Sequence, residues 1–127
     1  MGFNLLLRMA IQSYRELEVW NLAVDLVSEI YMLTERFPKK EQFILTAQIC
    51  RASISIPSNI AEGYGRKHRG EYVHHLSIAK GSLCEVETQL IIAGRLKYVT
   101  KEEVRKAWDM TQSIGKMLTA MLGKLGK

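Results

Sequence analysis

Apolar residues recur at helical spacing along almost the whole chain, and this spacing limits the fold more than any other feature. Side chains three or four residues apart share one face of an α-helix, so each such run predicts a helix with a core-facing stripe. The runs predict four helices, over residues 13–37, 41–64, 70–94 and 100–125. No segment alternates apolar and polar residues as a half-buried strand does. Four such helices joined by short loops predict an all-α, antiparallel up-down-up-down four-helix bundle.

The second predicted helix carries a proline in its interior. Its apolar spacing keeps its phase across that proline, through Phe43, Ala47, Cys50, Ile54, Pro57, Ala61 and Tyr64. Proline removes one backbone hydrogen bond and crowds the carbonyl group four residues earlier, which bends a helix or breaks it. The constant phase favours one helix kinked at Pro57. The alternative is a break followed by a short helix capped by Asn59.

Capping signals mark several helix ends. Ser13 with Glu16, and Thr100 with Glu103, have the spacing of a capping box, in which a hydroxyl and a carboxylate satisfy free amide groups of the first turn. Gly63 and Gly65 are predicted to close the second helix in the left-handed conformation. The signals therefore support helix starts at Ser13 and Thr100.

The first predicted helix carries two apolar stripes. Leu17, Trp20, Val24, Val27, Tyr31 and Thr34 form the first stripe, and Val19, Ala23, Leu26, Ile30, Leu33 and Phe37 form the second. A bundle core covers a single stripe about 100° wide, and soluble monomers rarely expose a large apolar patch. The sequence therefore predicts a homo-oligomer whose interface contains Val19, Leu26, Ile30 and Leu33. The alternative is one wide apolar face inside a single subunit.

The chain has 127 residues, of which 47% are hydrophobic and 24% charged, a composition that suits one globular domain. We expect residues 13–127 to form the bundle and residues 1–12 to be a poorly ordered extension, with Met9 as an alternative start. No run approaches the roughly 20 apolar residues of a membrane span. Cys50 and Cys84 lie in apolar helical contexts and are expected to be reduced core residues. These features predict a cytoplasmic protein with no membrane association.

Positive charge is concentrated in one part of the sequence. Residues 36–69 hold seven Lys/Arg and two Glu, so this segment alone accounts for the net charge of +5. Basic surfaces attract polyanions, and an oligomer would multiply that attraction. The sequence predicts binding of RNA or DNA, with Tyr64 as a ring on which an unpaired base can stack. The predicted phosphate contacts are Lys39, Lys40, Arg51, Arg66, Lys67 and Arg69. An ordinary solvated basic loop, or a surface for an acidic protein partner, remains the alternative.

Catalytic and metal-binding patterns are absent or incomplete in the sequence. Glu71 and His74 have the Glu-x-x-His spacing of di-iron bundles, but those sites need two such motifs and two more carboxylates. The core stripe of this helix runs through Tyr72, so both side chains are expected to point outward. No serine or cysteine nucleophile stands beside a base in any recognisable pattern. The sequence predicts a protein that is not an enzyme and has no metal or cofactor.

Polar residues near Pro57 allow two interpretations. Ser53, Ser55, Ser58 and Asn59 can hydrogen-bond the carbonyl groups that the proline leaves without partners. Alternatively, Asn59, Glu62 and Arg66 form a polar ridge in which the carboxylate holds the guanidinium in place for a ligand. The sequence leaves both interpretations open.

Several motifs resemble those of a known family, the four-helix-bundle proteins associated with 23S rRNA intervening sequences. They are Leu17-Glu18-Val19-Trp20, Phe37-Pro38, Gln48-Ile49-Cys50-Arg51-Ala52, Ile56-Pro57-Ser58-Asn59-Ile60-Ala61-Glu62-Gly63 and Ile78-Ala79-Lys80-Gly81-Ser82-Leu83. The resemblance covers nearly the whole chain from Tyr14. It implies an up-down bundle that assembles as a ring-like homopentamer with a basic surface, encoded in bacterial rRNA insertions or elsewhere in bacterial genomes.

The resemblance also implies possible partners. A related branch is similar to accessory proteins of diversity-generating retroelements, which bind nucleic acid and a reverse transcriptase, so an adaptor that docks a polymerase is the second functional expectation. The family has no catalytic residues to transfer. This chain departs from the pattern at Cys50, where the family often has a basic residue, and at 67–70, where Lys-His-Arg-Gly replaces a serine cap.

Overall fold

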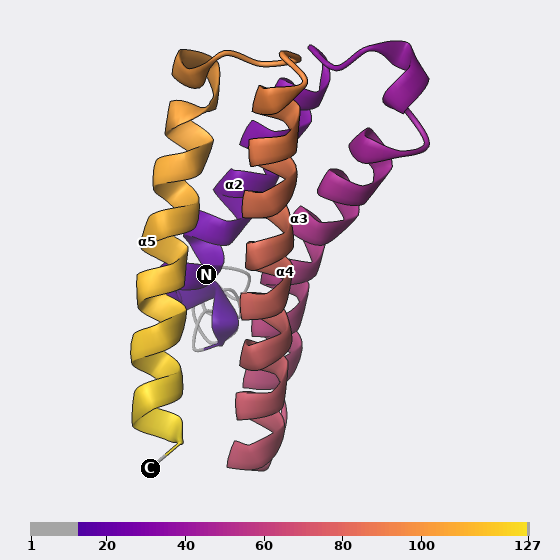
Figure 1. The fold of residues 1–127 in the computed structure, drawn as a ribbon. Helices are drawn as coiled ribbons and strands as arrows, with labels where there is room; N and C mark the ends of the chain where they lie inside the picture. The colour runs from indigo at the N-terminus through magenta and orange to yellow at the C-terminus, as the bar shows by residue number, and fades with distance from the viewer. Residues whose placement is uncertain (1–12, 127) are drawn as a thin grey trace, which may run out of the picture.

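The computed structural model describes residues 13–126, and the predicted extension 1–12 lies outside them. A 3₁₀ turn, η1 (Tyr14–Glu16), precedes the first long helix, and a second, η2 (Lys39–Glu41), follows it. Four helices make up the rest: α2 (Glu18–Thr34), α3 (Leu45–Tyr64), α4 (Arg69–Arg95) and α5 (Lys101–Leu125). Successive helices run in alternating directions (Figure 1), so the described chain is the predicted all-α four-helix bundle.

The core lies where the four helices face one another, and the stripes predicted for the last two helices line it. Leu76, Ala79, Leu83, Val86, Leu90 and Ala93 of α4 are buried, as are Ala107, Thr111, Ile114 and Leu118 of α5. The Thr111 hydroxyl donates to the carbonyl oxygen of Trp108 at 2.6 Å, which satisfies this buried polar group. Helical period alone identified the inward face of both helices.

The prediction for the first helix chose the wrong stripe. Val19, Leu26, Ile30 and Leu33, assigned to a contact between copies, are all buried within the single chain. The other stripe lies outside the core, where Val24 is 37% and Tyr31 49% exposed. The core takes the stripe whose side chains have no polar atoms, whereas the other stripe carries a phenol, an indole and a hydroxyl that can hydrogen-bond water.

The same exchange of faces occurs in α3. In the predicted stripe only Pro57 is fully buried, and Phe43 and Ile54 are 85% and 42% exposed. The core face is a different set of residues: Leu45, Ile49, Ala52, Ser53, Ile56 and Ile60. The helix continues unbroken through Pro57, so the expectation of one helix rather than two is confirmed. A kink at that residue stays a prediction.

The capping predictions hold at one end and fail at others. Thr100 and Glu103 form the predicted capping box of α5. Ser13 caps only the 3₁₀ turn η1, because Leu17 is extended and α2 begins one residue later. No glycine among residues 13–126 has a positive φ, so Gly63 and Gly65 do not close α3 in the left-handed conformation.

The two exposed stripes meet along the outside of the α2–α3 pair. The Thr34 side chain of α2 lies near the Cys50 thiol of α3 and partly offsets the rise in its pKa, so the two stripes come close at this point. We call the exposed apolar residues Val24, Tyr31, Phe43 and Ile54 the α2/α3 seam. Within the described residues, none of the helices combines the length and apolar character that crossing a membrane requires.

Candidate nucleic-acid interface

The six predicted phosphate contacts are exposed but do not form one patch. Lys39 and Lys40 lie in η2 at one end of the bundle, and Arg66, Lys67 and Arg69 lie around the loop at the other end (Figure 1). The 20 residues of α3 separate the two ends, which corresponds to about 30 Å of helix. Arg51 is exposed on α3 between the two ends. The structure therefore divides the predicted site into two basic ends.

At the α3–α4 end, one arginine is held by a carboxylate. Arg66 Nη2 lies 2.8 Å from Glu62 Oε1, which is the predicted pair four residues apart. Within residues 13–126, Arg66 is the one member of the six that takes part in an ion pair. Lys67 and Arg69 flank the N-cap residue His68, whose side chain makes no cap hydrogen bond. These two cations therefore add to the positive end of the α4 dipole.

Tyr64, the residue predicted to stack on a base, is partly exposed and partly packed against another tyrosine. The residue is 41% exposed, and its ring contacts that of Tyr72 edge-to-face, with ring centroids 5.9 Å apart. Burial, with a smaller contribution from Tyr64, raises the pKa of the Tyr72 phenol. Tyr64 thus packs against Tyr72 of α4 and still keeps part of its surface open to solvent.

At the η2 end of the bundle, the carboxylate of Glu41 accepts hydrogen bonds from residues other than the lysines. Glu41 Oε2 accepts a hydrogen bond of 2.7 Å from the Tyr98 hydroxyl, which raises the pKa of Tyr98. Glu41 Oε1 accepts from the Leu45 amide at 3.3 Å. These contacts tie η2 to the loop before α5 and leave Lys39 and Lys40 exposed without an ion pair in the described part of the chain.

The polar residues around Pro57 mainly hold α3 against α4. Asn59 Nδ2 donates to the carbonyl oxygen of Ser55 at 2.9 Å, and Asn59 Oδ1 lies 3.0 Å from His75 Nδ1. The Ser82 hydroxyl donates to the Ser55 hydroxyl at 2.8 Å. A longer contact of 3.5 Å joins Gln89 to Gln48. Since His75, Ser82 and Gln89 are seven residues apart, they form a polar ladder that fixes the register of the two helices.

Gly63 also serves the α3–α4 contact. A Cβ atom at this position would lie 2.7 Å from His75 Cβ and 3.0 Å from Tyr72 Cδ1. Only glycine lets the two helices approach this closely without a shift of the backbone. The Ile56-to-Gly63 block, the most distinctive motif of the sequence, is therefore explained by packing and register.

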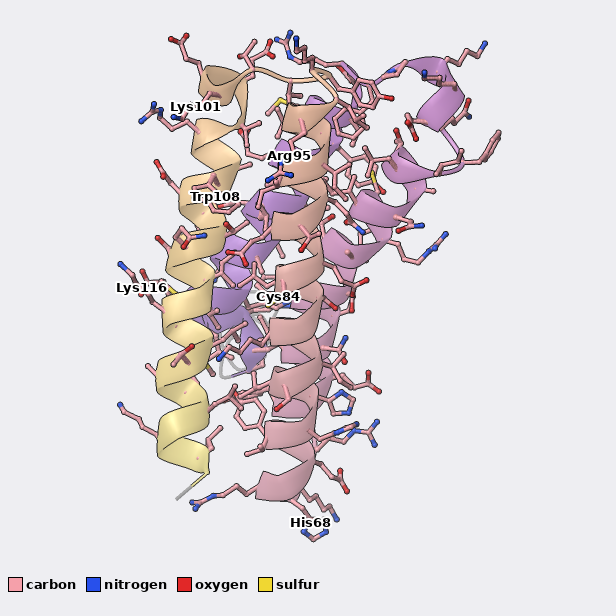
Figure 2. All side chains as sticks on the ribbon, viewed as in Figure 1. His68, Cys84, Arg95, Lys101, Trp108 and Lys116 are labelled. Carbon is pink, nitrogen blue, oxygen red and sulfur yellow. The ribbon has the colours of Figure 1, made fainter. Side chains whose placement is uncertain are left out.

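Charge counting along the sequence missed a second group of cations. Arg95 of α4, with Lys101 and Arg105 of α5, borders a hollow that contains the indole of Trp108. Figure 2 shows Arg95, Lys101 and Trp108 at one end of the α4–α5 pair, opposite to His68. The signal was present in the sequence, because Lys101, Arg105 and Trp108 follow one another at steps of four and three on one helix face.

The side chains considered for catalysis or metal binding stay apart. Glu71 and His74 are both exposed, as their positions beside the core stripe predicted. No group of three metal-binding side chains occurs within residues 13–126. Both cysteines are free, but Cys84 is exposed rather than in the core, contrary to expectation. Burial raises the pKa of the half-buried Cys50 thiol, which favours the unreactive protonated form.

Comparisons with known proteins agree with the fold. The family model described as 23S rRNA-intervening sequence protein matches residues 15–120. The structure is similar to the crystal structure of a protein with unknown function from the S23 ribosomal protein family of Bacteroides thetaiotaomicron, with a TM-score of 0.76 and 25% sequence identity. That similarity covers 82% of this chain and 97% of the other. No curated protein matches the sequence.

Proposed function

The chain belongs to the 23S rRNA-intervening sequence protein family, and from this premise we propose that it is a non-catalytic, oligomeric bundle of the cytoplasm that binds RNA or DNA. The observation that carries the proposal is the exposure of all six predicted cations, five of them outside any ion pair in residues 13–126. Uncompensated surface cations release counterions from a nucleic acid when they contact phosphates.

Self-association supports this proposal by bringing several basic ends together. The aliphatic stripe of α2 is buried in the core of one subunit and cannot contact another copy. The proposed contact between copies is therefore the α2/α3 seam. Phe43 is 85% exposed, so a neighbouring copy that covers it removes a large apolar surface from water. The number of copies implied by the family resemblance is five, and the exposed apolar side chains of the seam are the surface that we expect a neighbouring copy to cover.

An electrophoretic shift assay with single-stranded and double-stranded RNA and DNA tests the binding. If the six cations contact phosphates, the affinity should fall on the order of 10³-fold between 50 and 200 mM salt. The double variant Lys67→Glu with Arg69→Glu should weaken binding by at least about tenfold, because two phosphate contacts become repulsive.

A matched control uses the same change of net charge at another place. Lys116→Glu with Lys124→Glu alters two exposed lysines of α5 and should affect binding much less. Equal losses in the two double variants would mean that only net charge attracts the nucleic acid. Absence of any shift at 50 mM salt would contradict the proposed function.

The second candidate function is a protein adaptor. The specific observation in its favour is the hollow between α4 and α5, where cationic side chains border an apolar floor. None of the six predicted phosphate contacts lines that hollow, so the two functions depend on separate residues.

A further inference from the structure

A groove runs between α4 and α5 at the end where the two helices are joined. Its volume is about 550 Å³. Its floor is formed by Leu90, Val99, Val104 and Trp108. Gly94 lines the same groove, and no atom lies within 4 Å of the place where its Cβ would be. The absence of a side chain at Gly94 therefore leaves room for an apolar group from another molecule.

The border of this groove is strongly cationic. Arg95, Lys101 and Arg105 line it and are all exposed, and Asp109 is the single carboxylate among its lining residues. The indole N–H of Trp108 is a further hydrogen-bond donor. A ligand that fits this border carries carboxylates or other acceptors around an apolar body.

A second hollow, of about 480 Å³, lies between the same two helices, nearer the other end of the bundle. Its lining includes Lys80 and Lys116, and its one carboxylate, Glu87, accepts a hydrogen bond of 2.7 Å from Gln112 across the two helices. On α4 the two hollows extend from Lys80 to Arg95, which is about 22 Å of helix axis. Five cations and two carboxylates thus line the two hollows, which together span the length of a short helix.

We propose that this α4/α5 groove binds an acidic amphipathic helix of a partner protein. An amphipathic helix in a groove between two helices places aliphatic anchors on the floor and its charged flanks on the border. The floor favours this occupant over a nucleic-acid strand, because stacked bases need flat aromatic partners and only Trp108 is aromatic. The proposal is independent of nucleic-acid binding, since it uses none of the six predicted phosphate contacts.

The test uses a synthetic, fluorescein-labelled peptide of about 15 residues, with Leu at positions i, i+3, i+4 and i+7 and Glu on both flanks. A peptide of the same composition in scrambled order is the first control. The chain has two tryptophans, so Trp20→Phe leaves Trp108 as the only tryptophan reporter. We expect saturable binding by fluorescence anisotropy, together with a change in Trp108 emission that the scrambled peptide does not cause.

Two glycines of α4 offer a matched pair of variants. Gly94→Leu fills the groove, whereas Gly81→Leu adds the same side chain to an exposed site of α4 outside it. A Cβ at either position meets nothing within 4 Å, and leucine is a better helix former than glycine, so both variants should fold. We expect Gly94→Leu, and separately Arg95→Glu with Arg105→Glu, to weaken peptide binding by at least about tenfold. Gly81→Leu should bind as the parent chain does.

Three results would overturn the proposal. The first is equal affinity of the amphipathic peptide for the parent and Gly94→Leu chains, or no saturable binding at all. The second is displacement of the peptide by a thymidine oligonucleotide whose own binding Gly94→Leu abolishes, which would assign the groove to nucleic acid. The third is a change of subunit number in Gly94→Leu by light scattering, which would assign it to a second copy of this chain.

Discussion

Gly63 shows how a single residue determines a helix contact. The sequence suggested a left-handed closing residue at this position, because glycine after an apolar helix commonly has that role. The structure instead places Gly63 inside α3, buried against His75 and Tyr72. Sequence alone could not separate the two roles, since the contact depends on a helix that begins several residues later.

Gly63→Ala should destabilise the fold by about 1–3 kcal/mol, because the added methyl group overlaps His75 Cβ and forces α3 and α4 apart. The matched control is Gly81→Ala, where open space lets the better helix propensity of alanine stabilise by up to about 1 kcal/mol. Urea unfolding followed by circular dichroism measures both. A Gly63→Ala variant as stable as Gly81→Ala would show that the close approach does not matter.

Periodicity predicted each helix but not always its inward face. Where an element has one stripe, as in α4 and α5, the predicted stripe is the buried one. Where an element has two, as in α2, the spacing fits both stripes equally and the choice depends on the chemistry of their side chains. Leu26 and Ile30 are buried and Tyr31 is exposed, because an aliphatic stripe loses no hydrogen bonds to water on burial.

The geometry of a loop or cap could be predicted only where it depends on a few consecutive residues. The Thr100–Glu103 capping box depends on four consecutive residues and is present. The turn after α4 instead uses Lys97 with a φ of 64°, and lysine carries no sequence signal for that conformation. The Tyr98 amide donates to the carbonyl of Ala93 at 3.0 Å, a hydrogen bond typical of a helix closed by a left-handed residue.

The start of α5 should make stability depend on pH. The Thr100 backbone amide, followed by Arg36 at 2.6 Å, lowers the pKa of the Glu103 carboxyl below its ordinary value. Because the carboxyl has a lower pKa in the folded state, its ionisation stabilises the fold at pH values above its ordinary pKa. This stabilisation is lost as the pH falls through the lowered pKa. Glu103→Gln should therefore melt below the parent chain at about pH 7 and approach it near pH 3.

Glu102→Gln is the control for this pH profile, because its carboxylate is exposed and has no ion pair within residues 13–126. Its melting temperature should track the parent chain across the same range. A Glu103→Gln difference that stays constant down to pH 3 would mean that the carboxylate charge contributes nothing to the fold.

Over the whole molecule, the fold decides which charged side chains lie together. Residues that are close in the sequence window 36–69, which accounts for the net charge of +5, do not form one surface. The window 36–69 is divided between opposite ends of the bundle, whereas Arg95 and Arg105, ten residues apart, border one groove. The fold class could be predicted from the helical spacing of apolar residues, because this spacing depends only on residues close together in the sequence. Surface patches depend on which helices become neighbours, and therefore only part of the candidate site could be predicted from sequence.

The α2/α3 seam is the whole-molecule feature on which the proposed oligomer and its combined basic ends depend. Val24→Glu with Tyr31→Glu places two charges in the seam, outside the core, and should reduce self-association without unfolding the chain. The matched control is Ser77→Glu with Ser113→Glu, two exposed positions of α4 and α5 away from the seam.

Sedimentation velocity at micromolar concentration tests this claim most directly. The parent chain and the Ser77→Glu/Ser113→Glu control should sediment as an assembly several times the subunit mass of 14.5 kDa. The Val24→Glu/Tyr31→Glu variant should sediment as smaller species with unchanged helical content. A parent chain that sediments as a stable, soluble monomer would contradict the oligomer, and with it the proposal that several subunits combine their basic ends to hold a nucleic acid.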